Sequence, residues 1–248
     1  MIIAIDGTVA SGKSTAAKKL AAKLGFLYIN TGLMYRGVAA YARVNNIPTT
    51  EAEQIASCVK NLKIDLKNIN GAQHVFINGK DLTHEALAPD IGIYVSNIAD
   101  NPGVREVLVK EQRRLGLEAG NAVLEGRDIG SDVFPDADVK FFVIAKARER
   151  AKRRLEDDRK RNPELTLDAV EKAVLDRDKR DRERPVGALK KMPGAIEIDT
   201  TDLSPEETIE LMTKYLSVKI HVSSVIKNLK FNNEIFRSKT GKSFCHSS

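Results

Sequence analysis

A run of eight residues close to the N-terminus has the composition and spacing of a phosphate-binding loop. Gly7-Thr8-Val9-Ala10-Ser11-Gly12-Lys13-Ser14 matches the pattern G-x-x-x-x-G-K-S. In such a loop the backbone N–H groups and a helix N-terminus hold phosphate oxygens, the lysine reaches the β- and γ-phosphates, and the hydroxyl ligates Mg²⁺. A plain strand-to-helix turn with a capping serine is the alternative. We predict that a nucleoside triphosphate binds here through Lys13 and, with Mg²⁺, Ser14.

Two further polar clusters come directly after predicted strands. They are Asn30-Thr31-Gly32-Leu33-Met34-Tyr35-Arg36 and Glu125-Gly126-Arg127-Asp128. Ligands of parallel α/β sheets bind beyond the carboxyl ends of the strands, so both clusters are expected to face the loop. An arginine there can clamp a second phosphate, and an acidic residue such as Glu125 can orient the ligands of Mg²⁺. The alternatives are a helix start with an exposed arginine and an Arg-Asp pair on a plain loop.

Two later stretches of the chain are dense in arginine. The first contains Arg148, Arg150, Arg153 and Arg154, and the second runs from Asp176 to Arg184. Charge runs of this kind are usually solvated helix faces with ion pairs four residues apart. Two basic helices around the break at Asn162-Pro163 also suit a mobile lid that brings arginines onto a transferring phosphoryl group. We predict such a lid over about residues 148–184.

The elements that must position these clusters alternate between strands and helices. The predicted buried strands are Ile2–Ile5, Phe26–Ile29, Ala122–Leu124, Phe141–Ala145 and Ala195–Ile198. Helical patterns separate them, and the alternation predicts an α/β fold with a parallel five-stranded sheet flanked by helices. Residues 62–81 differ, because alternating apolar residues are joined there by the turn pairs Asn70-Gly71 and Asn78-Gly79. They predict a small antiparallel insert.

Composition narrows the class of protein further. The 248 residues carry a formal net charge of +6, of which residues 217–248 alone contribute +5, so a basic face over the whole body is not indicated. Cys58 and Cys245 lack metal-ligand spacing and a disulfide framework. The apolar run at the N-terminus is too short for a signal peptide, and no stretch approaches the ~20 residues of a membrane helix. We expect a cytoplasmic protein without membrane or nucleic-acid partners, ending in a poorly ordered basic tail; nucleic-acid binding by that tail is the alternative.

Together these motifs resemble those of bacterial-type cytidylate kinases, which belong to the P-loop nucleoside monophosphate kinases. The resemblance extends from Ile2 to about Leu216 and rests on Asp6–Thr15, Thr31–Arg36, Glu125–Gly130, Val133–Ala137 and Arg177–Arg184. It implies one P-loop kinase domain over residues 1–216, with a CMP-binding insert at about 62–100 and a helical lid. It also implies in-line transfer of the γ-phosphoryl group of ATP to CMP and dCMP, with Mg²⁺, by a monomer.

The resemblance assigns roles to single residues. Residues 7–15, Thr15 included, would bind ATP. The CMP site would consist of Thr31, Tyr35, Arg36, Ser96, Arg105, Arg127, Asp128, Asp181 and Arg184, with Ser96 and Arg105 on the base. The catalytic cations would be Lys13, Arg127, Arg150, Arg154 and Arg177, and Glu125 would act on the Mg²⁺ held by Ser14. Thr8, Val9, Ala10 and Glu125 differ from the Pro, Ser, Gly and Asp that are common in the family.

Other classes of P-loop protein fit this sequence less well. Ser96, Arg105 and the insert argue against a kinase for a different monophosphate. A GTPase switch would carry an Asn/Thr-Lys-x-Asp guanine motif, and the sequence has none. An ATPase that binds nucleic acid would spread basic charge over its body, whereas residues 1–145 have no net charge.

Overall fold

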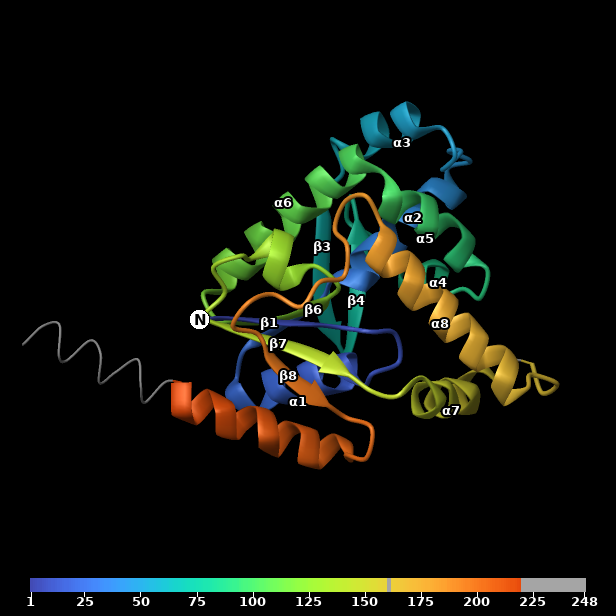
Figure 1. The fold of residues 1–248 in the computed structure, drawn as a ribbon. Coiled ribbons are helices and arrows are strands. Elements are labelled where there is room, and N and C mark those ends of the chain that lie inside the picture. The colour runs from blue at the N-terminus through green and yellow to red at the C-terminus, as the bar shows by residue number, and fades with distance from the viewer. Residues whose placement is uncertain (160–161, 220–248) are drawn as a thin grey trace, which may run out of the picture.

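The computed structural model describes residues 1–159 and 162–219 (Figure 1). Its centre is a parallel five-stranded sheet in the order β2-β6-β1-β7-β8. The strands are β1 (Ile2–Gly7), β2 (Leu27–Asn30), β6 (Ala122–Gly126), β7 (Val139–Ile144) and β8 (Ile196–Asp199). The predicted sheet is confirmed, and the ends of each strand lie within two residues of the predicted ones.

Alternate residues of the strands enter two different hydrophobic cores. Ala4 packs with α2 (Thr31–Val44), α3 (Ala52–Val59), α5 (Ile91–Asp100) and α6 (Pro102–Ala119) on one face of the sheet. Ile3 and Ile5 pack with α1 (Lys13–Leu24) and the helix over residues 205–219 on the other face. Helices therefore cover both faces of the sheet, as Figure 1 shows, because successive side chains of a strand point to opposite sides.

The predicted antiparallel insert is also confirmed. Strands β3 (Ile64–Ile69), β4 (Ala72–Ile77) and β5 (Lys80–Asp81) form a separate three-stranded sheet, followed by the short helix α4 (Thr83–Ala86). The Gln73 side chain ties this sheet to the edge strand β2, because it accepts from the Asn30 N–H at 2.9 Å and donates to the Tyr28 carbonyl oxygen at 2.5 Å. The insert is thereby fixed beside the first residues of α2.

The two arginine-rich stretches form the helices α7 (Ala147–Asp158) and α8 (Leu167–Glu183). These helices share a small core of their own, which consists of Ala151, Leu155, Val170 and Val174. Val9 of the phosphate-binding loop packs against this core. The two helices predicted for the lid region are therefore present and in contact with the loop, on the right of Figure 1.

The last described helix begins with a capping box at Ser204. Ser204 Oγ accepts from the Glu207 N–H at 3.1 Å, and the Glu207 carboxylate accepts from the Ser204 N–H at 2.8 Å, which is a capping box. The helix continues to residue 219. Residues 220–248 of the predicted tail lie outside the described residues, as do residues 160 and 161.

Candidate active site

The phosphate-binding loop connects the central strand β1 to α1, as its motif requires. Gly12 has a left-handed φ of 81° immediately before Lys13, the first residue of the helix. Lys13 is only 5% exposed, and its Nζ donates to the Thr8 carbonyl oxygen at 3.2 Å. Burial lowers the pKa of Lys13 to about 7. The loop thus holds a poorly solvated amine beside a helix N-terminus, a place where phosphate oxygens are favoured.

The hydroxyl that follows Lys13 meets the acidic residue at the end of β6. Ser14 Oγ donates to Glu125 Oε1 at 2.9 Å, and Glu125 is 4% exposed. Mg²⁺ prefers hard oxygen ligands and keeps several waters. A serine hydroxyl beside a carboxylate fits such an ion, although the described residues contain no group of three or more His, Cys, Asp or Glu side chains arranged to hold a metal by themselves.

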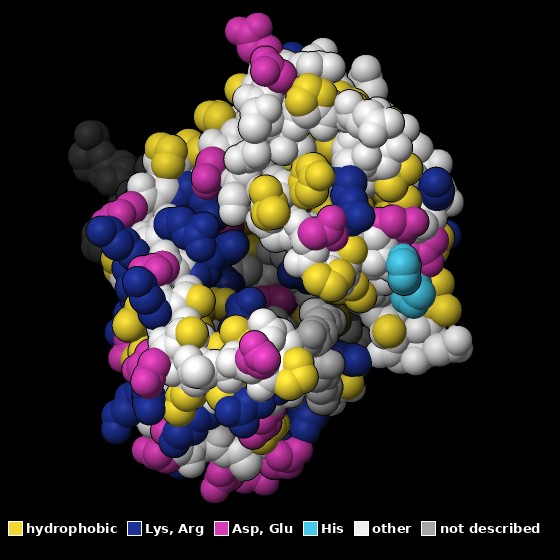
Figure 2. All heavy atoms as spheres, turned by 90° about the vertical axis from the view of Figure 1, so that its right-hand side faces the viewer, with side chains coloured by type: hydrophobic (Ala, Val, Ile, Leu, Met, Phe, Trp, Pro, Cys, Tyr) yellow, Lys and Arg dark blue, Asp and Glu magenta, His cyan; other side chains and the backbone are white. Residues whose placement is uncertain are grey.

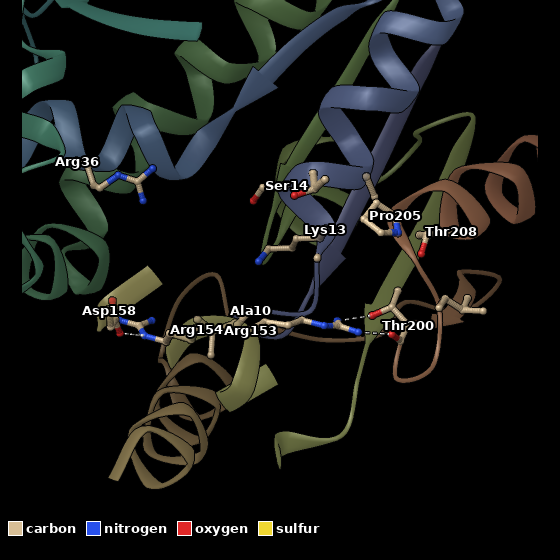
Figure 3. A pocket seen from close by; sticks show the side chains of 15 residues that line it. Ala10, Lys13, Ser14, Arg36, Arg153, Arg154, Asp158, Thr200, Pro205 and Thr208 are labelled. Carbon is tan, nitrogen blue, oxygen red and sulfur yellow. Dashed lines mark hydrogen bonds and ion pairs between the residues drawn. The ribbon is translucent and has the colours of Figure 1, made fainter. Parts of the chain in front are cut away.

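A cavity of about 660 Å³ opens on the α7 side of the loop. In Figure 3 Lys13 and Ser14 lie on one side of it, and Arg153 extends toward Thr200 beneath. The Arg153 guanidinium donates to Thr200 Oγ1 at 3.1 Å, and Arg154 pairs with Asp158 at 3.0 Å. The lining residues are Val9, Ala10, Gly12, Lys13, Ser14, Thr15, Ala16, Arg36, Arg153, Arg154, Asp158, Thr200, Leu203, Pro205 and Thr208.

Arg153 and Thr200 are site residues that the sequence analysis missed. Thr200 Oγ1 donates to the Ser11 carbonyl oxygen at 2.8 Å, so the segment after β8 is hydrogen-bonded to the loop. The presence of Arg153 among four arginines was the available signal, but spacing alone did not separate it from Arg150 or Arg154.

A second cavity, of about 280 Å³, lies on the other side of the same loop. Thr31, Tyr35, Arg36, Arg105, Arg127, Asp128, Arg177 and Arg184 all line it, together with Lys13, Ser14 and Glu125. Thr31 Oγ1 donates to the Glu125 carbonyl oxygen at 2.8 Å, which joins the start of α2 to the end of β6. Most residues that the resemblance assigns to CMP are thus brought together.

Two residues that line the second cavity carry buried polar atoms without a hydrogen-bond partner. Among the described residues, Arg36 Nε and the Tyr35 hydroxyl have no hydrogen-bond partner. Burial and the neighbouring cations Arg127 and Arg177 lower the pKa of Arg36, against the opposing effect of Glu125. A half-buried guanidinium whose buried Nε has no partner is a favourable place for an anionic group.

Three arginines of the second cavity converge on one carboxylate. Asp181, fully buried, accepts from Arg127 Nε at 2.7 Å, Arg177 Nε at 3.1 Å and Arg184 Nη2 at 3.3 Å. Burial raises the pKa of Asp181, but the charges of Arg127 and Arg177 outweigh it, so the pKa lies below its usual value. Asp181 therefore stays ionised and holds the three cations together.

Arg105 and Asp128, which also line the second cavity, form another charged pair. Arg105 pairs with Asp128, and both side chains are 7% exposed. The Arg105 guanidinium also donates to the Ala99 carbonyl oxygen at 3.3 Å, and its carbon lies 5.6 Å from the centre of the Tyr35 ring. This arrangement fixes one planar donor group in the wall of the cavity.

Asp6 is a buried carboxylate that the sequence analysis used only as part of a motif. Its oxygens accept from the backbone N–H groups of Ile129 at 2.8 Å and Gly130 at 2.7 Å. Burial raises the pKa of Asp6 to about 7, although these two hydrogen bonds oppose the shift. Asp6 thus attaches β1 to the turn over Ile129–Val133, which follows Arg127 and Asp128 directly.

Several predicted site residues do not line either cavity, and their roles stay predictions. Ser96 does not line the second cavity; its hydroxyl donates to the Gly92 carbonyl oxygen at 3.4 Å, and Val95 and Ala99 are the residues of α5 that face the cavity. Arg150 lines neither cavity, because its guanidinium is buried between the Val9 carbonyl oxygen and Asp178. Gly7, Thr8 and Ser11, three residues of the loop itself, line neither cavity.

The face that carries α7 and α8 is hollowed, and Lys and Arg side chains gather around the hollow (Figure 2). In the described ranges no helix is long and apolar enough to cross a membrane.

Comparison with known proteins shows the family of this chain. A family model described as cytidylate kinase matches residues 3–218. Proteins named cytidylate kinase from Bacillus subtilis (strain 168) and Bacillus velezensis (strain DSM 23117 / BGSC 10A6 / LMG 26770 / FZB42) are 42% and 43% identical over 217 and 205 residues. These alignments cover 88% and 83% of this chain and 96% and 91% of the relatives. With a match over nearly the whole described chain, the protein belongs to the cytidylate kinase family.

Proposed function

We propose that this protein transfers the γ-phosphoryl group of ATP to CMP and dCMP with the help of Mg²⁺, giving ADP and CDP or dCDP. Membership of the cytidylate kinase family supports the reaction class. The finer assignments below are argued from the arrangement of the site.

One observation carries the proposal: two cavities meet at a single phosphate-binding loop. Both are lined by Val9, Ala10, Lys13, Ser14 and Arg36. A triphosphate in the larger cavity and a monophosphate in the smaller one would place their terminal phosphates at this shared wall. Holding two reactants at one point is the main requirement of phosphoryl transfer, because the reaction needs positioning and charge neutralisation rather than a covalent intermediate.

The larger cavity is assigned to ATP. Lys13 and the N–H groups at the start of α1 would hold the phosphates, and Arg154 would approach them from α7. Arg153 would border the nucleoside together with Thr200, Leu203 and Pro205, since these residues also line the cavity. Mg²⁺, when bound, supplies charge neutralisation on the phosphates; Ser14 would hold it and Glu125 would orient its waters.

The smaller cavity is assigned to the acceptor nucleotide. Arg36 and Arg127 would bind the acceptor phosphate, and Arg177 would neutralise charge on the transferring group, because these cations line the cavity near Lys13. Arg105 and Asp128 would face the base. A donor group fixed by Asp128 and the Ala99 carbonyl oxygen penalises a base that cannot match it.

Acceptance of dCMP follows from the same assignment. The arginines placed on the phosphate and the arginine placed on the base need no ribose 2′-hydroxyl, and Asp181 already accepts three hydrogen bonds from arginines.

We also propose that the protein works as a monomer in the cytoplasm, a compartment that suits its free thiol at Cys58.

The test is ADP release over a panel of monophosphates at fixed Mg-ATP. We expect CMP and dCMP to exceed UMP, AMP and GMP in kcat/KM by at least about a hundredfold, the range that a site built on fixed polar partners reaches. Equal kcat/KM for UMP or AMP would show that the cytosine assignment is wrong. Lys13→Ala, with an unchanged far-ultraviolet circular dichroism spectrum, should lose turnover; full activity of this variant would contradict the role of the loop.

A further inference from the structure

Gly187 lies directly against the guanidinium of Arg105. It follows α8 in the segment that leaves the lid, and its φ of +65° is in the left-handed region. A methyl group placed on its Cα would overlap the Arg105 guanidinium, reaching Nη2, Cζ and Nε. Only a residue without a side chain leaves this space to the arginine.

The guanidinium of Arg105 is confined on its other sides as well. Asp128 pairs with it, the Ala99 carbonyl oxygen accepts from it at 3.3 Å, and the Tyr35 ring lies 5.6 Å away. Arg105 also separates two hollows: the acceptor cavity on one side and, on the other, a cavity of about 460 Å³ that Gly187 itself lines. Gly187 is therefore the wall against which Arg105 rests on the side away from the acceptor.

The segment that carries Gly187 is anchored to the rest of the protein. The Leu189 N–H donates to the Asp181 carbonyl oxygen at 2.7 Å, and Arg184 donates to Asp100 at 2.7 Å. Ala188 and Leu189 are 8% and 4% exposed. A larger residue at position 187 would consequently displace the flexible end of Arg105 rather than the backbone, which would move the guanidinium toward the acceptor cavity and away from Asp128.

We propose that Gly187 is a positioning residue for recognition of the acceptor base: the space that it leaves open sets how far Arg105 extends into the acceptor cavity. This proposal rests on the proposed function, because it takes the acceptor to be CMP. It adds a residue that touches no substrate and acts through Arg105 alone.

The variant Gly187→Ala tests the proposal against the matched control Gly194→Ala. Gly194 has a similar left-handed φ of +74°, and nothing lies within 4 Å of a Cβ added there, so its replacement carries the backbone strain without the overlap. We expect Gly187→Ala to raise KM for CMP and the Kd for CMP in titration calorimetry by about tenfold or more, and to lower the kcat/KM ratio of CMP to UMP. KM for ATP should stay within about twofold of the wild type, because the donor cavity is unchanged. Gly194→Ala should leave all of these values unchanged.

A double-mutant cycle with Arg105→Ala shows whether the effect passes through the arginine. With the guanidinium removed, Gly187→Ala should add nothing further to the Kd for CMP. Should Gly187→Ala alone fail to fold, the double variant should recover the wild-type circular dichroism spectrum, because the overlapping group is gone.

Three results would overturn the proposal. They are a Kd for CMP in Gly187→Ala no higher than in Gly194→Ala, an added effect of Gly187→Ala in the Arg105→Ala background, and a double variant that stays unfolded. Failure of the proposed function is a separate result: it appears in the wild-type monophosphate panel, before any variant is compared.

Discussion

Arg150 and Asp178 form a buried ion pair at the junction of the lid and the phosphate-binding loop. The Nη2–Oδ2 distance is 2.6 Å, and the two side chains are 5% and 2% exposed. Arg150 also donates to the Val9 carbonyl oxygen at 3.0 Å, and the Val9 N–H donates to Asp178 at 3.3 Å. The pair thus binds both the N–H and the carbonyl oxygen of Val9, and it joins α7 to α8.

Replacing Asp178 by Ala should destabilise the protein strongly, because it leaves the Arg150 guanidinium buried without its counter-ion. We expect the free energy of unfolding in urea to fall by about 3–5 kcal/mol. The control is Asp168→Ala, which removes a pair with Arg148 on the exposed surface of the same helix and should cost less than about 1 kcal/mol. Equal losses in the two variants would mean that the Arg150–Asp178 pair does not stabilise the lid.

Neutralising Asp181 should impair the acceptor site more than the fold. In Asp181→Asn the three arginines around position 181 repel one another without a compensating charge, so Arg127 and Arg177 should move from their places in the cavity. We expect kcat/KM for CMP to fall by about a hundredfold, with a smaller change in KM for ATP. Asp176→Asn, at an exposed position of α8, should behave as the wild type; a wild-type kcat/KM in Asp181→Asn would refute the prediction.

The Lys13 amine should take up a proton when ATP binds. Its pKa is about 7 in the unliganded site because of burial, and the negative charge of a triphosphate would raise it. At pH 8 the amine should therefore change from largely neutral to charged when ATP binds. Titration calorimetry in two buffers of different ionisation enthalpy should show uptake of up to about one proton per ATP. Lys13→Met should abolish this difference between the buffers, and a wild-type enthalpy that is independent of the buffer would contradict the assignment.

The buried carboxyl group of Asp6 should make the free energy of unfolding fall as the pH rises from about 4 to about 7. Its pKa is about 7 in the folded protein, against 3.8 for an ordinary aspartate side chain, so the folded state binds more protons between these values. The contribution is complete below about pH 4 and is lost as the pH rises to about 7, at up to about 1.4 kcal/mol per pH unit. The free energy of unfolding in urea, compared between the wild type and Asp6→Asn from pH 5 to 8, isolates the contribution of Asp6. Parallel pH profiles for the two proteins would rule out titration of Asp6.

Arg153 should contribute to ATP binding and not to the acceptor side. Its guanidinium donates to Thr200 Oγ1 at 3.1 Å and lines the donor cavity. We expect Arg153→Ala to raise KM for ATP by about tenfold and to leave KM for CMP within twofold. Arg148→Ala is the matched control, because Arg148 is an exposed arginine of the same helix that pairs with Asp168 and Glu171. A similar KM for ATP in both variants would show that Arg153 does not contribute to ATP binding.

Several features of the fold could be predicted because they depend on residues that are close in sequence. The loop motif, the cap at Asn30 and the capping box at Ser204 are local patterns, and the structure contains each of them. The sheet and the antiparallel insert follow from apolar periodicity and turn pairs, which report how single segments are buried. The uncertain part of those predictions was the position of the strand ends.

The arginines show where a local pattern stops being informative. Arg150, Arg153 and Arg154 look alike in sequence, yet one is buried against Asp178, one supports Thr200 and one pairs with Asp158 on the lid. Likewise Ser96 turns out to bond to its own helix, while its neighbours Val95 and Ala99 face the acceptor cavity. The direction in which a helix presents its side chains depends on its rotation against other elements, and no spacing rule contains that rotation.

By itself the sequence determined that the chain has a phosphate-binding loop between a central strand and a helix, inside a parallel α/β fold with an insert and two basic helices. The tertiary structure alone decided which distant groups meet: Asp6 with the N–H groups of Ile129 and Gly130, 123 and 124 residues away, and Gly187 with Arg105. The physical reason is that helix caps and apolar periodicity connect residues within one or two turns of chain. Long-range hydrogen bonds, charge pairing and exclusion of side chains act through space, between elements whose places are set by packing of the whole core.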